Sequence, residues 1–132
     1  MKLLLKSVTA IVLSLSTLTA LAAPTYLTTH NNTGVESNAF IAGSPSPYPT
    51  PANATRQVYW NLVRLACWGH TTADGQCSAM IKMATNTANP IEIGTVYLTV
   101  ATGEINPKQL SNNGYTFVVN NIGETTITKN AQ

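Results

Sequence analysis

The sequence predicts an all-β fold, an antiparallel β-sandwich of about seven short strands with one disulfide inside the domain. Two observations support this class. Short β-prone segments alternate with turn-forming residues beyond residue 22, and no long helical period interrupts them. The order of elements also lacks the strand–helix–strand alternation of a parallel sheet. This spacing is typical of an immunoglobulin-like architecture, and a small β-barrel is the alternative.

Residues 1–22 have the pattern of a secretory signal peptide. Lys2 and Lys6 form the positive start, residues 8–18 form the apolar run, and Ala20-Leu21-Ala22 is a cleavage motif. The apolar run is short and rich in Ser and Thr, which does not suit a membrane span of about 20 residues. We therefore expect cleavage after Ala22, no membrane insertion afterwards, and a protein that is periplasmic or secreted.

The remainder of the chain has a size that suits one domain, and its net charge is zero. The whole sequence has 7 basic and 5 acidic residues, and removal of Lys2 and Lys6 leaves 5 of each. A neutral chain of this kind predicts no nucleic-acid partner. Asn and Thr are abundant instead, and their amides and hydroxyls suit hydrogen bonding to sugars. Asn31-Asn32-Thr33 and Asn53-Ala54-Thr55 match the N-glycosylation pattern, which matters only in a eukaryotic secretory pathway.

Composition divides the exported part into three segments. Residues 23–43 form a β-prone N-terminal arm, which either adds a strand to the domain or is offered to a neighbour. Residues 44–52 form a connector in which four prolines alternate with other residues. This connector is either a stiff tether or a crossover from one sheet to another. Residues 53–132 form the main part of the single domain.

Cys67 and Cys77 are the only cysteines, and export makes a disulfide between them the expected state. The chain-entropy model gives such a loop about 3 kcal/mol of stabilisation. We expect the bond to join two neighbouring strands at the ends that flank a loop. A redox or metal-binding thiol pair is the alternative, but the spacing is not that of a Cys-x-x-Cys motif.

Residues 57–68 are the most apolar stretch beyond the signal peptide, and we predict a central strand there. Val58 and Trp60 would face one side, while Tyr59 and Val63 would face the other. A helix is the alternative, with Thr55 as its cap and with Leu62 and Leu65 at helical spacing.

Two later segments give more specific predictions. Residues 91–100 form a strong strand in which Gly94 marks a bulge or a close approach of another chain segment. Residues 115–119 and 124–129 flank a turn and predict a hairpin.

No catalytic residue, cofactor site or metal site is predicted. His30 and His70 are the only histidines, and no Ser stands in a Gly-x-Ser-x-Gly frame. A small secreted hydrolase, one alternative function, would need one of these histidines beside an acidic residue in a cleft. A periplasmic copper or other metal-binding protein is another alternative. Met80 and Met83 would lie on opposite faces of a strand, however, and would not converge on one ion.

We therefore predict an exported, non-catalytic binding protein whose partner is a protein or a surface glycan. Its expected contact surface is the loop of residues 68–76, with Trp68, His70 and Asp74 as the contact residues. The disulfide would hold this loop rigid, and a rigid surface loses less entropy on binding.

Overall fold

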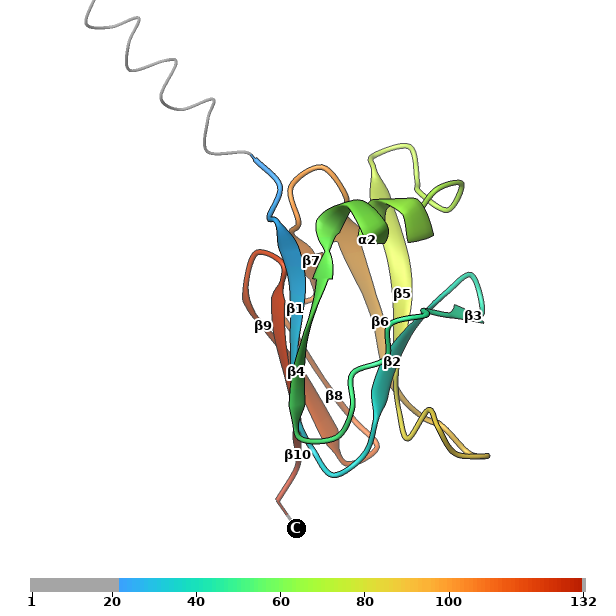
Figure 1. Ribbon diagram of the computed structural model, residues 1–132, viewed down its shortest axis with the longest axis vertical. Coiled ribbons are helices and arrows are strands. Elements are labelled where there is room, and N and C mark those ends of the chain that lie inside the picture. Colours follow the sequence, from blue (N-terminus) through green and yellow to red (C-terminus); the bar gives the residue numbers. More distant parts are fainter. Residues whose placement is uncertain (1–21, 132) are drawn as a thin grey trace, which may run out of the picture.

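The computed structural model describes residues 22–131, which form ten strands and one helix arranged in two layers (Figure 1). The predicted signal peptide, residues 1–22, lies outside the described residues except for Ala22. The elements are β1 (Tyr26–Asn32), β2 (Ser37–Ile41), β3 (Ser44–Pro45), β4 (Ala54–Tyr59), α2 (Trp60–Ala66), β5 (Gln76–Met83), β6 (Ile91–Thr99), β7 (Ile105–Asn106), β8 (Gln109–Asn112), β9 (Tyr115–Asn121) and β10 (Glu124–Lys129).

The strands form two open sheets of five strands each, so the predicted sandwich is confirmed. Sheet A has the order β4-β1-β10-β9-β8 and sheet B the order β3-β2-β5-β6-β7. All strand pairs are antiparallel except β1 with β10. The described residues do not close into a barrel, and the likeness to immunoglobulin domains stays a prediction. The strands beyond the expected seven are short, since β3 and β7 have 2 residues and β8 has 4.

Alternation along the strands builds the core between the layers. In β5 every second residue from Cys77 to Met83 is buried, and the residues between them are more exposed. Strand β6 buries Ile93 and Val96 on the same side because a register shift in its pairing with β5 inserts one extra residue. Among residues 22–131, no helix is long and apolar enough to cross a membrane.

Gly94 lies at this register shift, as the sequence predicts. Its φ of 155° is one that side chains rarely adopt, and a Cβ there would lie 3.2 Å from Leu110 Cδ1. The position therefore combines a bulge with a close approach of β8. The predicted hairpin of residues 115–129 is also present, as the antiparallel pair β9–β10.

Residues 23–43 are integrated in both sheets. Strand β1 lies between β4 and β10 in sheet A, and β2 pairs with β5 in sheet B. The proline-rich segment forms the short strand β3 and then crosses from sheet B back to β4 in sheet A. Backbone hydrogen bonds between Ser37 and Thr50 fix this crossover against β2.

The expectation of one strand over residues 57–68 is wrong beyond Tyr59. Strand β4 ends at Tyr59, and the helix α2 covers Trp60–Ala66. Leu62, Arg64 and Leu65 are good helix formers, and the buried Trp60 and Val63 are three positions apart on one helix face. The alternative cap is also not observed, since Thr55 lies in β4 and Tyr59 occupies the N-cap without a side-chain hydrogen bond.

Asn31 anchors the end of the sandwich opposite α2. Its side chain is fully buried, and its amide nitrogen donates hydrogen bonds to the carbonyl oxygens of Val35, Thr50 and Pro51 at 2.8, 3.2 and 3.1 Å. Its Oδ1 accepts from the Thr33 hydroxyl at 2.7 Å. One side chain thus joins the end of β1, the following turn and the crossover, and it is inaccessible to the modification that the Asn31-Asn32-Thr33 pattern would suggest.

Candidate functional site

The disulfide between Cys67 and Cys77 is present, as predicted, but it joins a helix to a strand. Cys67 is the C-terminal cap of α2, and Cys77 lies in β5. Their Cα atoms are 5.9 Å apart, and both side chains are fully buried. The expectation that the bond joins two strands is wrong because the chain turns into a helix after Tyr59. The bond therefore fixes the end of α2 onto sheet B.

The Trp68 loop, defined as residues 68–76, follows Cys67, and hydrogen bonds hold its backbone in place. The His70 amide donates to the Cys67 carbonyl, and the Thr72 amide donates to the Gln76 carbonyl, both at 2.9 Å. The Thr72 hydroxyl donates to a carboxylate oxygen of Asp74, and the Gln76 amide donates to Thr72 Oγ1 at 3.1 Å. Asp74 therefore helps to shape the turn, while His70 and Trp68 lie exposed on it.

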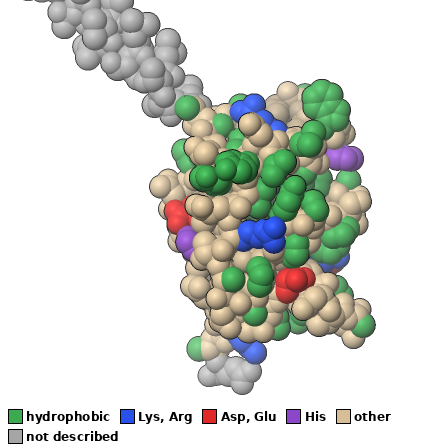
Figure 2. All heavy atoms as spheres, in the orientation of Figure 1, with side chains coloured by type: hydrophobic (Ala, Val, Ile, Leu, Met, Phe, Trp, Pro, Cys, Tyr) green, Lys and Arg blue, Asp and Glu red, His purple; other side chains and the backbone are tan. Residues whose placement is uncertain are grey.

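Large apolar side chains are exposed around this loop. Trp68 is 81% exposed, and Leu65, on the last turn of α2, is 70% exposed. Figure 2 shows hydrophobic side chains extending from the upper part of the molecule, where α2 lies, towards the middle of this face. Leu65 is not among the predicted contact residues, because the strand expected over residues 57–68 would bury its side chain. The alternative of a helix predicts its exposure, since Leu65 does not lie on the helix face formed by Trp60 and Val63.

The two predicted histidines lie in different places. His30 is on β1, where its Nδ1 is 2.9 Å from Thr55 Oγ1 and its Nε2 is 2.8 Å from Glu124 Oε2. These three side chains come from the neighbouring strands β4, β1 and β10 of sheet A. The carboxylate and the imidazole are 41% and 33% exposed. None of the three residues lines either of two cavities, one between the sheets and one beside the start of α2.

The structure offers little support for a metal centre. Within residues 22–131, no group of three or more His, Cys, Asp and Glu side chains could hold a metal ion. Met83 is fully buried, whereas Met80 is partly exposed and accepts a long contact from Thr95 Oγ1 at 3.9 Å. The copper hypothesis therefore stays a prediction without a described set of ligands.

Tyr26 and Tyr59 form an aromatic pair on the outside of sheet A, next to the start of α2. Their ring centroids are 5.0 Å apart, and the two residues are register partners on β1 and β4. A hydrogen bond to Tyr59, with the charge that Tyr59 acquires on ionisation, raises the pKa of Tyr26 above its ordinary value of 10.0.

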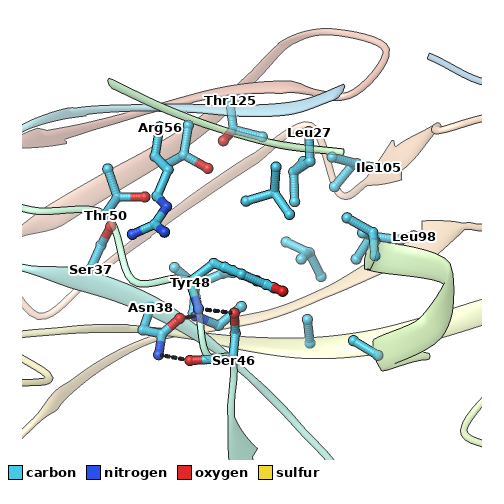
Figure 3. A pocket seen from close by; sticks show the side chains of 18 of the residues that line it. Leu27, Ser37, Asn38, Ser46, Tyr48, Thr50, Arg56, Leu98, Ile105 and Thr125 are labelled. Carbon is cyan, nitrogen blue, oxygen red and sulfur yellow. Dashed lines mark hydrogen bonds between the residues drawn. The ribbon is translucent and has the colours of Figure 1, made fainter. Parts of the chain in front are cut away.

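A cavity of about 110 Å³, which is not predicted from the sequence, lies between the two sheets. We call it the interlayer pocket; α2, β4, β2 and the crossover bound it. Figure 3 shows Arg56, Ser37 and Thr50 at one end of it, and Leu27, Leu98 and Ile105 at the other. The available signal was Arg56 itself, which alternates in β4 with exposed residues and shares the inner face with Val58.

Comparisons with known proteins place this arrangement in a family. A family model described as "T2SS substrate NttC" matches residues 1–130. The crystal structure of the Legionella pneumophila type II secretion system substrate NttC is 68% identical, with a TM-score of 0.79. That similarity covers 82% of this chain and 100% of the other. A comparison with curated protein sequences gives no match. The chain belongs to the NttC family of type II secretion system substrates.

Proposed function

We propose that this protein acts outside the cytoplasm as a non-catalytic binding module and that the Trp68 loop contacts its partner. Membership in a family of type II secretion substrates implies export out of the cytoplasm by way of the periplasm. The finer prediction, cleavage after Ala22, is part of this proposal. The observation that carries the binding role is the 81% exposure of Trp68 directly beside a buried disulfide.

An exposed aromatic side chain on a fixed backbone is suited to recognition. Trp and Tyr offer a large contact area at a low cost in conformational entropy, and Trp is enriched among the residues that dominate binding energy. Trp68 has the polar side chains of His70 and Asp74 in the same loop, a combination that suits stacking on a sugar ring with hydrogen bonds around it. A surface glycan is therefore the partner we favour, with a protein as the alternative suggested by the exposed Leu65.

The test is binding of labelled protein to a glycan array and to fixed cells, before and after protease treatment of the cells. We expect Trp68→Ala and His70→Ala each to weaken binding, by at least about tenfold for Trp68→Ala. Ile122→Ala is the matched control, because Ile122 is also an exposed apolar side chain (51%) but lies in the β9–β10 turn. Binding that both loop variants leave unchanged would remove the Trp68 loop from the proposal. Binding lost after protease treatment would identify a protein partner.

A small hydrolase is the second candidate, and the contacts of His30 are the observation that favours it. The order hydroxyl, imidazole and carboxylate, from Thr55 through His30 to Glu124, is the order that activates a nucleophile in hydrolases. Hydrolysis of p-nitrophenyl acetate tests it, with Thr55→Ala compared with the control Thr128→Ala, which changes an exposed threonine on strand β10 of the same sheet. Equal rates for the two variants and the parent would exclude this candidate.

A further inference from the structure

The interlayer pocket combines an apolar interior with a cation that has no carboxylate partner among residues 22–131. Most of its lining is aliphatic or aromatic and comes from both sheets and from α2. The ion pairs found within residues 22–131 are His30–Glu124, Lys82–Glu92 and Lys108–Glu104. Arg56, at one end of the pocket, is in none of them.

Two contacts hold the Arg56 side chain in place. Its Nη1 donates to the Pro49 carbonyl oxygen at 2.9 Å, and its Cζ lies 5.6 Å from the centroid of the Tyr48 ring. A guanidinium has five N–H donors, so this carbonyl leaves others for a ligand. Two parallel N–H groups fit a carboxylate particularly well. Figure 3 shows the guanidinium beside Tyr48 and on the side of the pocket where Ser37 and Thr50 lie.

The opposite end of the pocket suits a hydrocarbon. Leu27, Leu98 and Ile105 lie there, and Leu98 and Ile105 are 5% and 2% exposed. A cavity of about 150 Å³ with this kind of lining holds benzene in another protein. The volume of about 110 Å³ found here therefore suits a few methylene groups rather than a ring system.

We propose that the interlayer pocket binds a free fatty acid of short to medium chain length. The carboxylate pairs with Arg56 at the polar end, and the end of the alkyl chain fills the space beside Leu98 and Ile105. The buried side chains of Leu98 and Ile105 limit the length of the alkyl chain that fits. This site is separate from the Trp68 loop, none of whose residues lines the pocket.

The first experiment titrates the full secreted chain with butanoate, hexanoate, octanoate and decanoate, by calorimetry and by ¹H–¹⁵N NMR. Affinity should rise about fourfold for each added methylene group while the chain still enters the pocket, and then level off. Octanoate should bind at least about tenfold more tightly than octanol or octyltrimethylammonium, because a hydrogen-bonded charge pair forms only with the acid. Shifts of backbone signals should centre on β2, β4 and the crossover.

Two variants locate the site. Arg56→Gln should weaken octanoate binding about tenfold, and Ala39→Leu should weaken it by filling the cavity that Ala39 lines on β2. Arg64→Gln is the matched control, since Arg64 is an exposed arginine of α2 that does not line the interlayer pocket. Trp68→Ala should also leave octanoate binding unchanged, so failure of this proposal and failure of the glycan proposal are distinguishable.

Several outcomes would overturn the proposal. Octanoate that does not saturate, or that binds no better than octyltrimethylammonium, would remove the role of Arg56. Affinity that keeps rising with chain length, with NMR shifts centred on Leu65 and Trp68, would show adsorption to the exposed apolar surface instead. If Arg56→Gln does not fold, the head-group series on the parent protein and Ala39→Leu decide the question without it.

Discussion

The two ends of the sandwich are fixed by different means. At the α2 end, one covalent bond between Cys67 and Cys77 holds the chain, and the side chains that follow it stay exposed. At the other end, Asn31 is fully buried and holds the turn and the crossover through hydrogen bonds to carbonyl groups. A buried bond between two sulfur atoms needs no polar partners, so the surface around it is available for recognition. A buried amide has to be surrounded by its own partners, which turns that end into a structural anchor.

The largest expected effect is at the Asn31 end. Asn31→Ala removes the amide that donates to the carbonyl groups of Val35, Thr50 and Pro51 and the oxygen that accepts from Thr33, which should cost about 3–4 kcal/mol of unfolding free energy. Urea denaturation measures the loss. Asn32→Ala is the control, because Asn32 is the exposed neighbour on β1 and should change stability by less than about 0.5 kcal/mol. Equal effects of the two substitutions would show that the hydrogen bonds of Asn31 contribute nothing specific.

Removal of the disulfide should have the next largest effect. The double variant Cys67→Ala, Cys77→Ala should lose about 3 kcal/mol, because the unfolded chain regains the freedom of the closed loop. His70→Ala, within the same loop, should leave the urea midpoint unchanged and serves as the control. Partner binding through Trp68 should also fall in the double variant, although Trp68 is kept. A loss of stability below about 1 kcal/mol would show that the packing of Trp60 and Val63 is enough to hold α2.

The smallest expected effect concerns Tyr26 and Tyr59 at the α2 end. Tyr59→Phe removes the hydroxyl that hydrogen-bonds to Tyr26, so the pKa of Tyr26 should fall towards 10. Because folding raises this pKa, its contribution to stability is complete below pH 10 and is lost as the pH rises through the raised value. ¹³C NMR of the tyrosine Cζ atoms measures the titration, with Tyr97→Phe on sheet B as control. An unchanged pKa of Tyr26 in Tyr59→Phe would contradict the assigned cause.

Local patterns in the sequence were enough for several features of this fold. The strand predicted over residues 91–100, the turn before Glu124 and the special position of Gly94 each depend on neighbouring residues and on the pleat of a strand. The disulfide followed from export and from the presence of only two cysteines. The location of that bond at the end of a helix did not follow, because apolar residues at short spacing fit both a buried strand and a helix.

Such local patterns do not predict most of the candidate sites. His30 meets Glu124 across 94 residues and Thr55 across 25, and the two contacts exist because β1 lies between β4 and β10. The interlayer pocket needs Arg56 from β4, Tyr48 from the crossover and Leu98 from β6 in one place. In the sequence, each of these residues is typical of its own segment and gives no sign of a pocket.

The sequence by itself determined that this is an all-β chain with a signal peptide pattern, one disulfide and a neutral surface rich in Asn and Thr. These properties depend on the amino-acid composition, on the two-residue alternation of strands and on the oxidising compartment to which a signal peptide directs a protein. Only the tertiary structure decided that α2 forms after Tyr59, that Asn31 is buried, and that Arg56 faces an apolar cavity. The physical reason is that burial and the pairing of distant strands set the environment of a side chain, and both arise from contacts between segments far apart in the chain.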